Sequence, residues 1–229
     1  MSRVIVCDVN ETLLDIAALE PAFKTVFGDG RVVQEWFTTV LLYSEVATLA
    51  GPYDEFANIA AAALDMTAAA RGIRLAAHER TRILQGMLSL PAHPDVLDGL
   101  AMMRDAGLRL VTLTNSAPAA VERQLAHAAL TPFFERIFSV DPVRKFKPAA
   151  DVYRSVAESL ALPPDRLRMV AAHGWDITGA LRAGYAAAFV GRPGRVLYPL
   201  GPQPDIIASD FREVARLIIA AEATGAARV

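Results

Sequence analysis

Asp8 is the first residue of this sequence whose type and position favour chemistry. It follows the short β-branched run Arg3–Cys7 (RVIVC), which predicts a buried strand ending at this carboxylate. A carboxylate held rigidly at a strand end can attack a saturated or phosphoryl centre and form an ester-type intermediate. Taken alone, such an aspartate is more often a turn residue or a helix cap. A catalytic interpretation of Asp8 therefore needs partners elsewhere in the chain.

Two further polar segments could supply those partners. Thr114 and Asn115 follow the apolar run LRLVTL, and a hydroxyl beside an amide can hold an oxyanion, a carboxylate or a halide. Lys147 immediately precedes Pro148, a position that disfavours helix, and an ammonium beside Asp8 would keep that carboxylate ionised. Alone, the first segment also fits a helix-capping turn and the second a solvated basic loop.

A further candidate segment is Ala172-His173-Gly174-Trp175-Asp176, which follows a predicted strand. Asp176 begins a predicted helix, so it could be only the N-cap of that helix. Aromatic side chains in loops often line pockets, although a packed tryptophan is the commoner case. This segment is a functional candidate because it follows a predicted strand, as Asp8 does.

Composition excludes several classes of protein. Hydrophobic residues make up 53% of the 229 residues and charged residues 21%, which allows a sizeable core and argues against disorder. A net charge of −2 offers no basic surface for nucleic acid or for membranes, and the single Cys7 cannot form an intramolecular disulfide. The apolar run before Asp8 is too short for a signal peptide, and no run approaches the ~18 residues of a membrane span. We therefore expect a cytoplasmic enzyme.

Apolar periodicity divides the chain into two kinds of segment. Residues 16–91 show helical patterns, separated by Gly28-Asp29-Gly30, Gly51-Pro52 and Gly72, and few strand-like stretches. These residues are expected to form an inserted helical cap. The helices predicted there are Leu19–Phe27, Val32–Leu49, Tyr53–Ala70 and His78–Leu88.

The rest of the chain alternates between strand and helix patterns, which is typical of a mostly parallel, doubly wound α/β sheet. The predicted strands are Arg3–Cys7, Leu108–Leu113, Arg136–Val140, Arg168–Ala172, Ala187–Val190 and Ile206–Ala208. The predicted helices are Val96–Asp105, Pro118–Ala128, Ala150–Leu160, Asp176–Ala183 and Phe211–Ala221, before a frayed tail at Ala223–Val229. We expect a Rossmann-like core of residues 1–15 and 92–229, with polar clusters converging where the strand order reverses.

Together these segments resemble the nucleophile, Ser/Thr-Asn, lysine and acidic motifs of the haloacid dehalogenase superfamily, in that order. The resemblance covers essentially the whole chain. The stretches that look specifically like the (S)-2-haloacid dehalogenase (type II) family are Ser139–Val143, Lys147-Pro148 with Tyr153, and Trp175-Asp176 with Gly179-Ala180.

The resemblance implies hydrolytic dehalogenation of short 2-haloalkanoic acids, such as haloacetates and 2-halopropionates, without a metal or another cofactor. Asp8 would attack C2 and expel halide, and water would cleave the resulting ester at the Asp8 carbonyl. Lys147 would pair with Asp8, and Asp176 would orient Lys147 or the water. The other implied roles are tethering of the nucleophile or the substrate carboxylate by Thr12, Thr114 and Tyr153, halide contact by Asn115, and a pocket wall formed by Trp175. A homodimer is also common in this family.

Two departures separate the chain from the magnesium-dependent phosphatases of the superfamily. Those enzymes carry a second aspartate two residues after the nucleophile, where this chain has Asn10, which has no proton to give at neutral pH. They also bind the metal through an aspartate at the position of Ala172, and Mg²⁺ prefers carboxylate oxygens. Both differences fit metal-independent chemistry, with Asn10 as a substrate-binding candidate.

A third departure leaves the substrate open. The resembled dehalogenases bind halide through a cap arginine directly after a tryptophan, but here Phe37 follows the tryptophan, and residues 32–70 contain no lysine or arginine. Either Asn115, Trp175 and His173 hold the halide, or the hydrolase acts on another substrate, such as a phosphate ester. His173 could be a neutral base for the hydrolytic water or a cation that holds halide.

Overall fold

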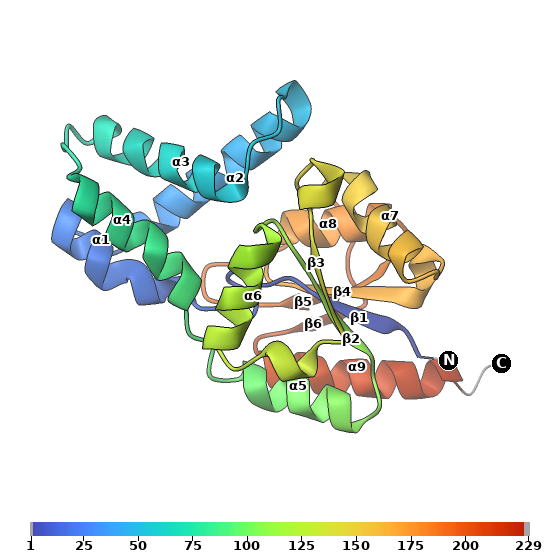
Figure 1. The fold of residues 1–229 in the computed structure, drawn as a ribbon. Coiled ribbons are helices and arrows are strands. Elements are labelled where there is room, and N and C mark those ends of the chain that lie inside the picture. Colours follow the sequence, from blue (N-terminus) through green and yellow to red (C-terminus); the bar gives the residue numbers. More distant parts are fainter. Residues whose placement is uncertain (1, 227–229) are drawn as a thin grey trace.

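A six-stranded, fully parallel sheet forms the centre of the computed structural model, which describes residues 2–226 (Figure 1). The strand order is β3-β2-β1-β4-β5-β6, so the chain extends the sheet to one side of β1 and then to the other. The strands are β1 (Val4–Cys7), β2 (Leu110–Thr114), β3 (Arg136–Ser139), β4 (Leu167–Ala171), β5 (Ala186–Val190) and β6 (Ile206–Ala208). The predicted Rossmann-like sheet is confirmed.

Helices cover both faces of this sheet. In Figure 1, α5 and α9 lie on one face, and α7 and α8 lie on the other. Burial on both faces explains why the central strands read as continuous apolar runs, since every residue of β1, β2 and β4 is buried. The helices of this part are α5 (Val96–Asp105), α6 (Pro118–His127), α7 (Ala150–Ser159), α8 (Gly174–Arg182) and α9 (Phe211–Ala226).

The helical insertion lies beside the sheet, beyond the carboxyl end of β1 (Figure 1). Its two connections to the core run side by side: Asp15 N–H donates to the Pro91 carbonyl at 2.9 Å, and His93 N–H donates to the Leu13 carbonyl at 2.9 Å. Its helices are α1 (Glu20–Phe27), α2 (Val32–Ala50), α3 (Phe56–Ala70) and α4 (Ala77–Gly86). This arrangement is the expected helical insertion into an α/β core.

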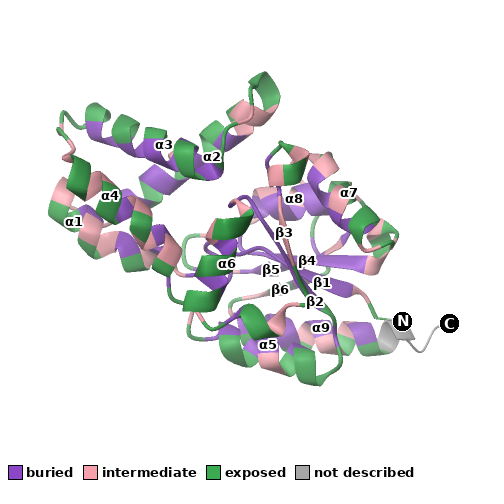
Figure 2. Ribbon diagram, in the orientation of Figure 1, coloured by how far each residue is buried: buried purple, intermediate pink, exposed green. Residues whose placement is uncertain are grey.

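Burial follows the same division into two parts. The buried side of each helix faces its neighbours or the sheet, and the exposed side faces outward (Figure 2). In the insertion, Trp36 and Phe37 are buried and their rings pack edge to face at 6.1 Å. No helix among residues 2–226 is long and apolar enough to cross a membrane.

Several predicted boundaries were wrong by one to five residues. Helix α3 begins at Phe56, not at Tyr53, because Gly51-Pro52 and Asp54 occupy a loop in which Asp54 accepts from Asn58. Helix α8 begins at Gly174, so Asp176 lies in its first turn and does not cap it. The last helix continues to Ala226 where a frayed tail was expected, and residues 227–229 lie outside the described part of the chain.

Candidate active site

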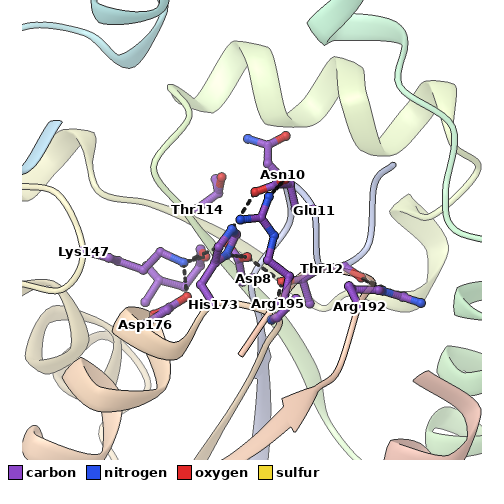
Figure 3. A network of polar contacts seen from close by, with 12 residues as sticks. Asp8, Asn10, Glu11, Thr12, Thr114, Lys147, His173, Asp176, Arg192 and Arg195 are labelled. Carbon is purple, nitrogen blue, oxygen red and sulfur yellow. Dashed lines mark hydrogen bonds and ion pairs between the residues drawn. The ribbon is translucent and has the colours of Figure 1, made fainter. Parts of the chain in front are cut away.

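The polar clusters meet where the strand order reverses. Strand β1 lies between β2 and β4, and the segments that follow these three strands meet at the carboxyl edge of the sheet. Figure 3 shows Asp8, Lys147, His173 and Asp176 pointing toward one another there. The convergence predicted from the strand ends is therefore present in the structure.

Asp8 is 5% exposed and accepts hydrogen bonds on both carboxylate oxygens. Lys147 Nζ lies 2.8 Å from Oδ1, and Thr12 Oγ1 donates to Oδ2 at 2.6 Å. His173 Nδ1 lies 3.3 Å from the same Oδ2. Burial favours the neutral acid, but Lys147 and His173 outweigh it and hold the pKa of Asp8 well below its ordinary value. Asp8 is thus an ionised, oriented carboxylate.

Lys147 is buried between two carboxylates. Its Nζ donates to Asp8 at 2.8 Å, to Asp176 Oδ2 at 2.6 Å and to the Leu113 carbonyl at 3.1 Å, which uses all three ammonium protons. Burial opposes the charge, but Asp176 and Asp8 together raise the pKa of Lys147 above its ordinary value. The ammonium therefore stays charged and fixes the distance between the two carboxylates.

Asp176 is fully buried and completes this cluster. Besides Lys147, it accepts from the Tyr153 hydroxyl, which lies 2.7 Å from Oδ1. Burial, with a smaller contribution from the Asp8 charge, raises the pKa of Asp176 and outweighs the effects of Lys147 and Tyr153. Tyr153 itself is 0% exposed, and its hydroxyl supports Asp176.

His173 connects Asp8 to a second buried carboxylate, Glu11. Its Nε2 lies 2.7 Å from Glu11 Oε2, and Glu11 also pairs with Arg195. Burial would lower the pKa of His173, but the hydrogen bonds to Asp8 and Glu11 and their charges raise it to about 9. At neutral pH the ring is therefore an imidazolium, which donates from both nitrogens.

Other predicted residues lie around this cluster with different partners. Asn115 Oδ1 accepts from the Lys147 backbone N–H at 3.1 Å, and its amide nitrogen has no partner among residues 2–226. Thr114 is buried and its hydroxyl accepts from the Ser116 backbone at 3.2 Å. The Asn10 amide donates to Ser116 Oγ at 3.1 Å and accepts from Gln124 at 3.1 Å, which directs it toward α6 and away from Asp8.

The two aromatic candidates lie at different distances from the cluster. Trp175 stacks on the His173 ring at 5.0 Å and has Lys147 Nζ 5.8 Å from its ring centroid. A cavity of about 330 Å³ adjoins Trp175 and His173 under residues 194–199. Phe37, in contrast, packs inside the helical insertion, 6.3 Å from Phe56. Phe56 in turn packs against Phe146 of the core, with ring centroids 6.1 Å apart.

Sequence reasoning missed Glu11, Arg195 and Arg192. Arg192 pairs with Asp95 at 2.7 Å and donates to the Thr12 carbonyl at 2.9 Å, which holds the loop after β1 in place. A signal for Glu11 existed, because it lies three residues after Asp8 in the same polar segment. The arginines follow β5, where no polar motif stood out.

Fold and site together define a doubly wound α/β core with a buried aspartate–lysine pair at its switch point. The model of the haloacid dehalogenase-like hydrolase family matches residues 3–184. The chain is 30% identical over 212 residues to an (S)-2-haloacid dehalogenase of Pseudomonas sp. (strain YL), which covers 92% of this chain and 91% of that protein. The chain therefore belongs to the haloacid dehalogenase-like hydrolase family.

Two comparisons concern proteins from Xanthobacter autotrophicus. An (S)-2-haloacid dehalogenase from this organism is 31% identical over 194 residues, covering 84% of this chain and 76% of that protein. The structure of an L-2-haloacid dehalogenase with chloropropionic acid covalently bound matches with a TM-score of 0.88 and 27% identity. It covers 95% of this chain and 98% of the other. Both agree with the resemblance inferred from the motifs.

Proposed function

We propose that this protein hydrolyses the carbon–halogen bond of short 2-haloalkanoic acids through an ester on Asp8. The observation that carries the proposal is Asp8 itself, ionised at the switch point and held by Lys147 at 2.8 Å and Thr12 at 2.6 Å. The similarity to (S)-2-haloacid dehalogenases supports this choice of substrate. Residues 16–91 are proposed to form a cap over this site.

In the first step, a carboxylate oxygen of Asp8 forms a bond to C2 as the carbon–halogen bond breaks and its electrons leave with the halide. A carboxylate is a modest nucleophile, so its orientation and its freedom from competing water supply much of the rate. Thr12 fixes the rotation of Asp8, because its hydroxyl also accepts from the Ala172 backbone at 2.9 Å. Lys147 keeps Asp8 ionised until the reaction begins.

In the second step, water adds to the carboxyl carbon of Asp8 and the 2-hydroxy acid leaves, which restores the carboxylate. Ester formation removes the negative charge of Asp8, and with it one of the two charges that raise the pKa of His173. The imidazolium can then release its Nδ1 proton to solvent, and the freed Nδ1 accepts a proton from the attacking water. His173 is proposed to be a cation during attack and a base during hydrolysis.

The departing halide needs hydrogen-bond donors or a positive surface. The Asn115 amide nitrogen, which lacks a partner among the described residues, is the proposed donor, and Trp175 forms the adjacent wall. Phe37 contributes only shape, since it is buried among the rings of the insertion. Thr114 is proposed to support the loop that presents Asn115.

Phosphate ester hydrolysis is less well supported. An acid for an alcohol leaving group would stand two residues after Asp8, and the Asn10 amide there is held by Ser116 and Gln124. The position of a second metal-binding carboxylate is Ala172, which offers no side-chain oxygen. The residues present do not fit a magnesium site, so no step is assigned to a metal.

The test is halide release from chloro-, bromo- and fluoroacetate and both enantiomers of 2-chloropropionate, measured with and without added Mg²⁺. We expect stoichiometric halide and 2-hydroxy acid with no effect of the metal, and a loss of roughly 10³-fold or more in Asp8→Asn. Magnesium-dependent turnover of phosphate esters, with no halide release from any haloacid, would replace this function with the phosphatase alternative.

A further inference from the structure

Glu11 adopts a backbone conformation that glutamate rarely takes. Its φ is 63°, in the left-handed region that favours glycine, and the residue is nevertheless only 4% exposed. Such strain costs on the order of 1 kcal/mol or more and persists where surrounding contacts enforce it. Glu11 N–H donates to the Leu14 carbonyl at 2.8 Å, and His93 Nε2 lies 3.2 Å from the Glu11 carbonyl. The loop therefore holds a strained residue whose side chain has a definite target.

That target is His173. Glu11 Oε2 lies 2.7 Å from His173 Nε2, on the side of the ring opposite Asp8. The other oxygen, Oε1, pairs with Arg195, which comes from the loop after β5. Figure 3 shows Glu11, His173 and Asp8 as successive links of one chain of polar contacts.

We propose that Glu11 is a positioning residue that keeps the Nε2 proton on His173 and holds Nδ1 facing Asp8, so that the ring carries both protons until the ester forms. The proposal rests on the dehalogenase function inferred above and identifies the residue that fixes the state of His173. A ring held only by Asp8 could rotate or lose its Nε2 proton, whereas a buried carboxylate on Nε2 prevents both.

The charges around His173 are consistent with this role. The ionisable groups of the cluster that surround the ring are Asp8, Glu11 and Asp176, which are acidic, and Lys147 and Arg195, which are basic. With His173 protonated, three cations balance three carboxylates. With His173 neutral, the buried cluster carries one uncompensated negative charge, which a low-dielectric site disfavours. The ring thus supplies a positive charge close to Asp8 in a chain whose helices α2 and α3 contain none.

Arg195 connects this arrangement to the helical insertion. Its guanidinium donates to Gln34 Oε1 on α2 at 2.8 Å as well as to Glu11. A cavity of about 360 Å³ borders the link and is lined by Glu11, Gln34, His93 and Arg195 among other residues. The orientation of Glu11 therefore depends on a contact between core and insertion.

The direct test follows the His173 ring by NMR as a function of pH in the whole protein without substrate. The His173 signal is identified among those of the four histidines as the one that is missing in His173→Asn. In Glu11→Gln, which keeps the shape and removes the charge, the titration midpoint of His173 should fall by roughly 1–3 pH units. The matched control is Glu20→Gln, because Glu20 lines the same 360 Å³ cavity as Glu11. In this variant the titration midpoint of His173 should equal that of the parent.

Kinetics give a second, separate readout. The alkaline decline of kcat/KM for haloacid turnover should move down in pH with the NMR midpoint in Glu11→Gln and disappear in His173→Asn. Adding Glu11→Gln to His173→Asn should then cost no further activity. Glu11→Gly, which suits φ 63°, should show the same midpoint shift if the glutamine variant proves unstable.

An unchanged His173 midpoint in both Glu11 variants would overturn the positioning role, even with haloacid turnover intact. Absence of halide release from every haloacid, together with the expected midpoint shift, would instead discard the dehalogenase function and leave the Glu11–His173 coupling in place. The two failures are therefore distinguishable.

Discussion

The three buried carboxylates of this site, Asp8, Asp176 and Glu11, have different surroundings. Asp8 receives donors from Lys147, Thr12 and His173, and its pKa is lowered in spite of its burial. Asp176 shares the same ammonium, yet burial raises its pKa. Glu11 faces the imidazole and a guanidinium. The proposed nucleophile is thus the carboxylate with the most complete set of donors, and the other two contact the side chains that hold it.

Removing the shared ammonium should damage stability as well as activity. Lys147→Met leaves Asp8 and Asp176 buried without their cation, so we expect a loss of about 3–5 kcal/mol in the free energy of unfolding at neutral pH. The control is Lys145→Met, because Lys145 is exposed and pairs with exposed Asp151, and it should cost less than about 1 kcal/mol. Urea denaturation measures both. Equal losses of unfolding free energy in the two variants would show that the buried ion pairs of Lys147 contribute no more to stability than the exposed pair of Lys145.

The protonation of His173 should also appear in the pH dependence of stability. Its pKa is raised from 6.5 in the unfolded chain to about 9 in the folded protein, so the stability it contributes is complete below pH 6.5. That contribution is lost as pH rises through about 9. The parent should therefore lose more free energy of unfolding over this interval than His173→Asn does. Parallel curves for the two proteins would contradict an imidazolium in the native state.

At the scale of elements, the close approach of α8 to the segment Lys147-Pro148 sets the geometry of the site. A Cβ built on Gly179 would lie 2.6 Å from Pro148 Cβ and 2.7 Å from the Tyr153 hydroxyl. Glycine at this position lets the helix carry Asp176 to within 2.6 Å of Lys147. Gly179 therefore contributes to the site indirectly, because the close packing that it allows places Asp176 beside Lys147.

Gly179→Ala should separate these elements. We expect a loss of about 1–3 kcal/mol from overpacking, and a drop in kcat/KM because Lys147 and Tyr153 shift together. Thermal unfolding and haloacid turnover provide the measurements. Gly99→Ala is a comparison, because its Cβ would meet Phe211 between α5 and α9, away from the site. Gly99→Ala should lower stability with much less effect on turnover. If Gly99→Ala instead lowered turnover more than Gly179→Ala does, the packing of α8 would not set the geometry of the site.

Sequence patterns predicted the elements better than their ends. The strands were predictable because the buried runs are apolar and largely β-branched, and the strand ends indicated the positions of Asp8, Asn115 and Asp176. Lys147 was indicated by its position before Pro148. The start of α8 was misplaced because Gly174 and Trp175 give no capping signal, while Asp176 does. The partner of Tyr153 could not be predicted, since it depends on how α7 packs against α8.

Across the whole molecule, buried ion pairs lie at both ends of the sheet. Near the amino ends of the strands, buried Arg168 pairs with Glu222 of α9 and with Asp205. At the carboxyl ends, the sheet presents Asp8 and the loops that hold its partners. The pairing of Glu11 with His173 and Arg195 was not predictable from the sequence, because it joins loops that follow β1, β4 and β5. The expected homodimer stays a prediction.

The most direct test of the central claim is turnover of 2-chloropropionate in heavy-oxygen water, followed by mass analysis of the peptide that contains residue 8. If Asp8 forms the ester, the oxygen of the first product molecule comes from the enzyme, and heavy oxygen accumulates in the Asp8 carboxylate over successive turnovers. Heavy oxygen in the product of the first turnover, with an unlabelled Asp8, would mean that water attacks C2 directly and would contradict the account.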